Sequence, residues 1–191
     1  MRVGLLGGSF NPAHEGHRHI SLEALRLLGL DQVWWLVSPQ NPLKPSAGMA
    51  PLDRRLRRAR DIANHPAIIA TDLERQIGTR YTAETLAALT SRFPRTRFVW
   101  LMGADNLMQL PRWRRWTLIF ETVPVAIFDR RPYSLRALSG QAARRYARQR
   151  VKGHQAALLA DAEPPAWVYF HTRLHPASAT ALRACRTVDP A

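Results

Sequence analysis

The chain has 191 residues and a mass of 21.7 kDa, with 46% hydrophobic and 22% charged residues, a composition typical of one globular domain. No apolar run approaches the roughly 20 residues of a membrane helix, and the single cysteine, Cys185, excludes a disulfide framework and a four-cysteine metal site. The first residues lack the charged and apolar segments of a signal peptide, so we expect a cytoplasmic protein.

The net charge of +14 suits an anionic partner, either RNA or a phosphorylated small molecule. The arginines are spread over most of the chain, and only Lys44 and Lys152 are lysines, so the sequence has no single basic stripe for a nucleic-acid backbone. We therefore expect small phosphorylated substrates rather than a nucleic acid or a membrane. The oligomeric state stays open, and a homo-oligomer is compatible with the sequence.

Short apolar segments alternate with amphipathic ones along the chain. Strands are predicted at residues 2–6, 32–38, 67–71, 97–102, 123–128 and 167–171. Helices are predicted at residues 15–28, 53–64 and 82–92, between 105 and 121, from 134 to about 151, and from 178 onward. This alternation predicts a doubly wound, Rossmann-like α/β fold: a mostly parallel sheet with helices on both faces, in a single domain of residues 1–191.

Several residues and segments indicate where elements end and where loops lie. Gly29 is placed to end the first helix, and Thr82 is placed to cap the helix that begins there. Arginine is expected to form the exposed face of the helix at residues 53–64. Residues 39–51, with four prolines, and residues 156–165 are expected to be loops.

The segment between the first strand and the first helix, residues 7–17, is the most informative. Gly7 and Gly8 would allow a positive φ and a close approach of the backbone to phosphate, and the N-terminus of the following helix favours anionic oxygens. His14 and His17 are three residues apart, so both can face one cleft. A tight turn with two surface histidines is the simpler alternative, but the histidines, glycines and an Asn-Pro pair together favour a nucleotide phosphate site.

Residues 14–17, HEGH, resemble the HxGH motif that a nucleotidyltransferase superfamily shares with class I aminoacyl-tRNA synthetases. Near the other end, residues 175–183 read HPASATALR, which alone indicates only a capped helix. They resemble the SxTxxR motif of the adenylyltransferases rather than the lysine-rich loop of the synthetases. The resemblance implies that Ser178, Thr180 and Arg183 bind the phosphates of ATP.

Residues 103–113, GADNLMQLPRW, resemble the GADNLxxLxxW segment of bacterial nicotinate-nucleotide adenylyltransferases. The resemblance implies that Gly103 and Asp105 approach the adenosine and that Trp113 stacks on the nicotinate ring. The alternative is that Asp105 caps a helix and that both tryptophans only pack against their neighbours; we keep the packing interpretation for Trp116.

The resemblance extends to other segments and implies a full set of site residues. Lys44 is available to phosphates, Thr82 and Thr85 lie in the segment that binds the nicotinate carboxylate, and Arg130, or Arg131 with a register shift, would hold the mononucleotide phosphate. The catalytic residues would be His14, His17 and Arg183. The residues for ATP would be Gly7, Gly8, Ser9, Phe10, His14, His17, Gly103, Asp105, Ser178, Thr180 and Arg183. The residues for the mononucleotide would be Asn11, Lys44, Thr82, Thr85, Trp113 and Arg130.

The implied reaction is the transfer of AMP from ATP to nicotinate mononucleotide in NAD biosynthesis, which gives deamido-NAD and pyrophosphate. Positioning two anions and neutralising their charge is the catalytic task, and no covalent enzyme intermediate is required. Mg²⁺ is the expected cofactor, held by substrate phosphates and water rather than by a dedicated set of protein ligands.

Two alternatives stay open. The acceptor could be another phosphorylated compound, nicotinamide mononucleotide or phosphopantetheine, although the pantetheine-phosphate enzymes resemble this pattern with threonine in place of His14. A basic RNA-binding domain on the same fold, with residues 144–150 as its contact helix, is the alternative from a different class.

Overall fold

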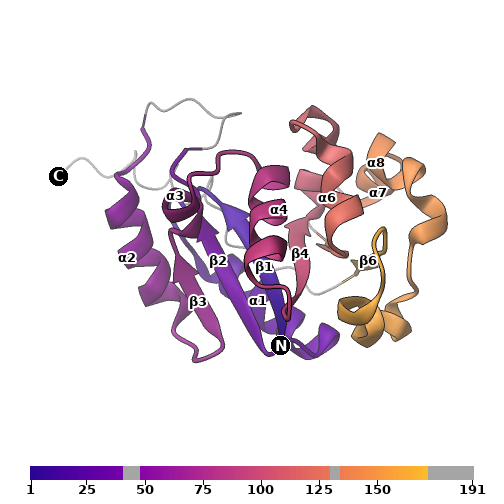
Figure 1. The fold of residues 1–191 in the computed structure, drawn as a ribbon, viewed down its shortest axis with the longest axis horizontal. Helices are drawn as coiled ribbons and strands as arrows, with labels where there is room; N and C mark the ends of the chain where they lie inside the picture. The colour runs from indigo at the N-terminus through magenta and orange to yellow at the C-terminus, as the bar shows by residue number, and fades with distance from the viewer. Residues whose placement is uncertain (41–47, 130–133, 172–191) are drawn as a thin grey trace.

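The computed structural model describes residues 1–40, 48–129 and 134–171. In this part of the chain, six strands form one parallel sheet in the order β3-β2-β1-β4-β5-β6 (Figure 1). The strands are β1 (Arg2–Gly8), β2 (Gln32–Val37), β3 (Ile68–Thr71), β4 (Arg97–Gly103), β5 (Val125–Phe128) and β6 (Trp167–Phe170). The order reverses direction between β1 and β4, as in a doubly wound sheet, so the predicted fold class is confirmed.

Helices cover both faces of the sheet (Figure 1). One face carries α1 (Glu15–Leu28), α2 (Leu52–Ala63) and the 3₁₀ helix η3 (Gly153–Asp161). The other carries α4 (Thr82–Arg92), α5 (Ala104–Gln109), α6 (Trp116–Thr122), α7 (Ser134–Leu138) and α8 (Gln141–Arg145). Three short helices complete the described elements: α3 (Leu73–Ile77), η1 (Leu110–Arg112) and η2 (Ala147–Gln149).

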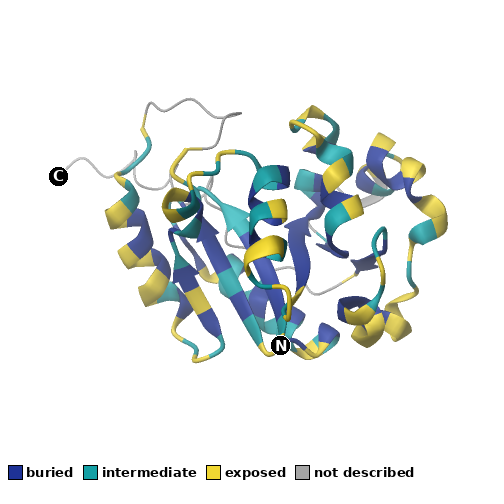
Figure 2. Ribbon diagram, viewed as in Figure 1, coloured by how far each residue is buried: buried dark blue, intermediate teal, exposed yellow. Residues whose placement is uncertain are grey.

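The sheet is buried because helices pack on both of its faces, and Figure 2 shows its strands as mainly buried residues. Side chains of a strand alternate between the two cores: Val3 and Leu5 face the core under α4 and α6, and Leu6 faces the core under α1 and α2. This two-sided burial explains why the strands are near-continuous apolar runs in the sequence. No helix in the described ranges is long and apolar enough to cross a membrane.

Each predicted strand is found within two residues of its expected bounds, and α1 spans the predicted residues. Gly29 ends α1 in the left-handed region with φ of 59°, as expected. Thr82, however, is the first residue of α4 rather than its cap; Tyr81 occupies the cap position and makes no side-chain capping bond. The expected arginine face of α2 is also wrong at one position, because Arg55 is only 3% exposed.

The helical regions predicted late in the chain are broken into shorter pieces. The region 105–121 contains α5, η1 with Pro111, and α6, since proline removes a helical hydrogen bond. The region 134–151 contains α7, α8 and η2, and most of the expected loop at 156–165 belongs to η3. The helix α3 was not predicted, and the helix expected from Ser178 lies outside the described residues.

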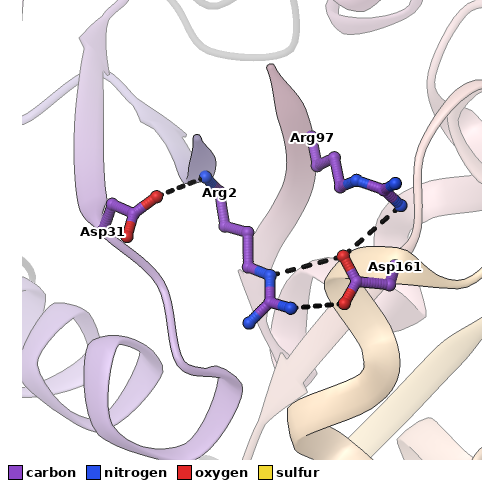
Figure 3. A network of polar contacts seen from close by, with 4 residues as sticks. All are labelled: Arg2, Asp31, Arg97 and Asp161. Atoms are coloured by element: carbon purple, nitrogen blue, oxygen red, sulfur yellow. Dashed lines mark hydrogen bonds and ion pairs between the residues drawn. The ribbon is translucent and has the colours of Figure 1, made fainter. Parts of the chain in front are cut away.

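An ionic network closes the amino end of the sheet (Figure 3). The Arg2 backbone N–H donates to Asp31 Oδ2 at 2.7 Å, and the Arg2 guanidinium contacts both carboxylate oxygens of Asp161, at 3.3 Å and 2.5 Å. Arg97 lies 3.3 Å from Asp161 Oδ1. Asp161, the last residue of η3, thus forms ion pairs with the first residues of β1 and β4, at the end of the sheet opposite the carboxyl ends of the strands.

Candidate active site

The carboxyl ends of β1 and β4 mark the point where the strand order reverses, and ligands of doubly wound sheets bind at this point. β1 ends at Gly8 and β4 ends at Gly103. The helix α5 begins directly after β4, and α1 begins seven residues after β1 ends. Gly7, Gly8, Gly103 and the N-termini of two helices therefore lie along the same edge of the sheet.

His14 and His17 form an interlocked pair at the start of α1. The Gly16 backbone N–H donates to His14 Nδ1 at 3.1 Å, and the His14 backbone N–H donates to His17 Nδ1 at 3.2 Å. The two ring centroids are 3.9 Å apart. Since a neutral imidazole that accepts at Nδ1 carries its proton at Nε2, both histidines are held as Nε2 donors.

A buried aromatic platform supports His17. The Phe10 ring lies 4.6 Å from the His17 ring and stacks on Trp35 at 5.1 Å. Ser21 Oγ donates to the His17 carbonyl at 2.9 Å and accepts from Trp35 Nε1 at 2.7 Å. The orientation of His17 is therefore fixed by packing and hydrogen bonds that the sequence motif did not reveal.

The turn before α1 differs in its backbone from the expectation. Neither Gly7 nor Gly8 has a positive φ; that conformation belongs to Phe10, with φ of 45°. A left-handed conformation costs a non-glycine residue about 1–2 kcal/mol, which the buried ring contacts of Phe10 offset. Gly7 is required for another reason, because a Cβ there would lie 2.4 Å from the Trp100 ring.

Ser9 and Asn11, which the resemblance assigns to substrates, connect the turn to α2 and to the residues that precede it. Asn11 Nδ2 donates to the Gly48 carbonyl at 3.1 Å, and the Ala50 N–H donates to Asn11 Oδ1 at 3.3 Å. The Ser9 carbonyl accepts from the Arg55 guanidinium at 2.6 Å. These contacts show how the turn is held, and the predicted substrate contacts of the two residues stay predictions.

Arg55 is a buried residue of this region that the sequence interpretation missed. Its guanidinium donates to four backbone carbonyls, those of Ser9, Ser38, Pro39 and Ala50, at 2.6–2.9 Å. Burial lowers the pKa of the Arg55 guanidinium. One signal was available, because position 55 shares a helix face with the buried alanines at 59 and 63.

Thr82 and Thr85 lie in the first turn of α4, next to a second buried group that was missed, Glu74. Thr85 Oγ1 lies 3.2 Å from the Tyr81 carbonyl, 2.9 Å from Thr79 Oγ1 and 3.3 Å from Glu74 Oε1. Burial raises the pKa of Glu74 to about 7, while hydrogen bonds from Ser38 and Thr85 oppose the shift. The Thr85 side chain is fully buried, so its role toward the substrate stays a prediction.

Trp113 and Asp105 lie in the segment that follows β4. Asp105 is half-buried in the first turn of α5, and Trp113 is half-buried after η1, packed against the core under α4 and α6. The Arg114 guanidinium lies 4.7 Å from the centroid of the Tyr81 ring. The two segments that the resemblance assigns to the mononucleotide, around residues 82 and 113, therefore lie side by side.

Several predicted residues lie outside the described part of the chain: Lys44, Arg130, Arg131, Ser178, Thr180 and Arg183. Whether the C-terminal motif meets the histidines is thus a prediction still. Within the described ranges, no group of three or more His, Cys, Asp or Glu side chains is arranged to hold a metal ion.

Comparisons with known proteins identify the family of the chain. A family model described as cytidylyltransferase-like matches residues 5–184. A probable nicotinate-nucleotide adenylyltransferase of Parvibaculum lavamentivorans is 55% identical, and the match covers 96% of this chain and 91% of that protein. A protein of the same name from Cereibacter sphaeroides is 57% identical, over 96% of this chain and 97% of that protein. The chain belongs to the nicotinate-nucleotide adenylyltransferase family.

Solved structures are similar to this fold at low sequence identity. Structures of the Plasmodium falciparum nicotinic acid mononucleotide adenylyltransferase, complexed with APC and with NaAD, match with TM-scores of 0.69 and 0.71. Both matches cover 96% of this chain and 82% of the other, at 14% and 15% identity. At this identity the likeness establishes the shared fold. Family membership, which rests on the closer relatives, confirms the predicted enzyme class, a nucleotidyltransferase.

Proposed function

We propose that this protein transfers AMP from ATP to nicotinate mononucleotide, forming deamido-NAD and pyrophosphate. The observation that carries the proposal is the pair of Nε2 donors of His14 and His17 at the start of α1, where the sheet changes direction. The helix N-terminus adds partial positive charge at the same place. This combination is suited to a triphosphate in a chain of this family.

In this reaction a 5′-phosphate oxygen of the mononucleotide attacks the α-phosphorus of ATP. The bond between the α-phosphorus and the bridging oxygen to the β-phosphate breaks, and pyrophosphate leaves with that electron pair. The attacking oxygen is already anionic, so no general base is needed. We assign His17 Nε2 to an oxygen of the α-phosphate and His14 Nε2 to the neighbouring phosphates, where both offset charge in the transition state.

The segments around residues 82 and 113 are the proposed mononucleotide side. Trp113 would stack on the pyridine ring, and Thr82 and Thr85 would bind its carboxylate from the start of α4, where the partial positive charge of a helix N-terminus favours an anion. Gly103 and Asp105 would approach the adenosine. Lys44, Arg130, Ser178, Thr180 and Arg183 would bind phosphates, and these assignments rest on the sequence motifs.

Mg²⁺ is proposed as the cofactor and would enter on the phosphates of ATP. When bound it would neutralise part of the charge that builds up during transfer. The substrates are small molecules, and a cytoplasmic location is part of the same proposal.

One assay tests the function. The purified protein is incubated with ATP, Mg²⁺ and, separately, nicotinate mononucleotide, nicotinamide mononucleotide or phosphopantetheine, and pyrophosphate and the dinucleotide product are measured. We expect kcat/KM for the acid mononucleotide to exceed that for the amide by at least about tenfold, because donors and positive charge suit a carboxylate. Equal turnover of the amide, or turnover of phosphopantetheine alone, would contradict the proposal. Salt-sensitive RNA binding without any turnover would favour the RNA-binding alternative.

A further inference from the structure

The Arg55 side chain crosses from α2 to the carboxyl edge of the sheet and is 3% exposed. Its Nη1 atom donates to the carbonyls of Ser9 at 2.6 Å and Ser38 at 2.7 Å. Its Nη2 atom donates to Pro39 at 2.9 Å, and its Nε atom donates to Ala50 at 2.8 Å. All three guanidinium nitrogens are therefore used, each on backbone oxygen.

The four acceptors belong to three separate pieces of chain. Ser9 lies in the turn between β1 and α1, Ser38 and Pro39 follow β2, and Ala50 precedes α2. Asn11 bridges the first and third of these pieces through the Gly48 carbonyl and the Ala50 N–H. Both strand ends lie next to each other, since β1 and β2 pair up to Gly8 and Val37. Arg55 thus joins the turn that leads to the histidines to the loop beside it.

The chemistry of this contact is specific to arginine. A guanidinium offers five N–H donors in one plane and stays charged, whereas lysine carries its donors on one nitrogen and cannot reach carbonyls on several sides. Charge-assisted hydrogen bonds are also stronger than neutral ones, and four carbonyl dipoles stabilise the buried charge. A residue that only anchored α2 to the core would not need this set of donors, and the buried alanines at 59 and 63 already pack there.

We propose that Arg55 is a positioning residue that holds the turn at residues 9–11 against the loop after β2, so that the two bound substrates meet in line. The inference rests on the proposed function, because it assigns the alignment of attacking oxygen and α-phosphorus to this contact. In this proposal Arg55 acts through the backbone that it binds rather than by contacting a substrate. Its loss should therefore misalign bound substrates more than it weakens the binding of either one.

The test compares Arg55→Ala and Arg55→Lys with Arg57→Ala and Arg57→Lys, which change an exposed arginine of the same helix. We measure thermal unfolding, the Kd of each substrate alone, and kcat and KM at a temperature where every variant is folded. We expect kcat of Arg55→Ala to fall about 100-fold while each Kd changes less than about threefold, since small misplacements in transfer reactions have effects of this size. Arg55→Lys should restore only part of kcat, and both Arg57 variants should match the native protein.

Hydrogen exchange of backbone amides supplies a readout that does not depend on activity. The Arg55→Lys variant keeps the charge and serves if the alanine variant does not fold. In this variant, amide exchange should increase about tenfold or more at residues 9–11, 38 and 40 but not in β4 or β5. If exchange rises only at these residues in the variant but the native protein shows no turnover, the proposed function is overturned, while the role of Arg55 in holding the turn against its neighbours stands. A kcat within about threefold of native in folded Arg55 variants, or exchange that rises evenly over the whole chain, would overturn the inference.

Discussion

Replacing Glu74 with glutamine should change how stability depends on pH. The carboxyl is buried, and its pKa is raised from 4.5 to about 7 in the folded protein. Below pH 4.5 the group is protonated in both the folded and the unfolded chain, so its contribution to the free energy of unfolding is fully present. Between pH 4.5 and 7 the unfolded chain loses this proton while the folded chain keeps it, so stability falls as pH rises.

The size of the pH effect on stability follows from the pKa shift of Glu74. The difference between 4.5 and about 7 corresponds to about 3 kcal/mol of unfolding free energy, lost over that pH range and constant above it. Glutamine keeps the shape and has no proton to lose. The difference in unfolding free energy between Glu74→Gln and the native protein should therefore move in favour of the variant by about 3 kcal/mol from about pH 4.5 to about pH 8.

Urea unfolding followed by circular dichroism at several pH values measures this difference. Glu163→Gln is the control, because Glu163 is exposed and the same substitution there should leave the pH profile unchanged. A profile for Glu74→Gln that runs parallel to the native one would refute the reasoning, since it would mean that Glu74 ionises in the folded state as easily as in the unfolded chain.

Three further substitutions test separate parts of the structure. Gly7→Ala should reduce the unfolding free energy by about 2 kcal/mol, because the new Cβ overlaps the Trp100 ring. Trp100→Phe in the same chain should recover part of this loss, and a loss of unfolding free energy below about 0.5 kcal/mol for Gly7→Ala would refute the overlap. Asp161→Asn should lower the unfolding free energy, measured by thermal or urea unfolding, by only about 0.5–1 kcal/mol, because the ion pair of Asp161 with Arg2 is partly exposed. This loss should become smaller in about 1 M salt, and a loss independent of salt would contradict an ionic origin. His17→Asn keeps an acceptor for the His14 N–H but loses the Nε2 donor, so kcat should fall about 100-fold in steady-state assays with little change in thermal stability. An unchanged kcat would mean that His17 does not stabilise the transition state.

The elements that the sequence predicted well are those whose pattern depends on burial alone. β1 and β4 are apolar because helices cover both faces, and α1 has both a periodic apolar face and a glycine in the left-handed region at its end. The proximity of His14 and His17 is also local, because His14 caps α1 in an extended conformation and the two side chains form a reciprocal capping box with the backbone of the first turn, so the pair could be predicted without any tertiary information.

The residues that were missed depend on contacts between distant segments. Arg55 lies among several arginines of α2, and the carbonyls that it binds come from the turn after β1 and from the connection between β2 and α2, which the pattern of α2 alone does not reveal. Glu74 lies in a helix of five residues, too short for a periodic pattern, and its hydrogen bonds join it to Ser38 and Thr85 elsewhere in the chain. The left-handed backbone of Phe10 accompanies ring packing on His17 and Trp35. The sequence pattern instead predicted a positive φ at the neighbouring glycines, Gly7 and Gly8, because glycine adopts it most easily.

Each imidazole of the site has two nitrogens with different tasks. Nδ1 of each histidine accepts a backbone N–H in the first turn of α1, and Nε2 is the nitrogen that the proposed function assigns to phosphate, so in this proposal the same side chains both cap the helix and bind substrate. An insertion or deletion between residues 14 and 17 would consequently damage the scaffold and the reaction in a single step. The spacing of three residues between the two histidines therefore serves the helix cap and the proposed phosphate contacts together.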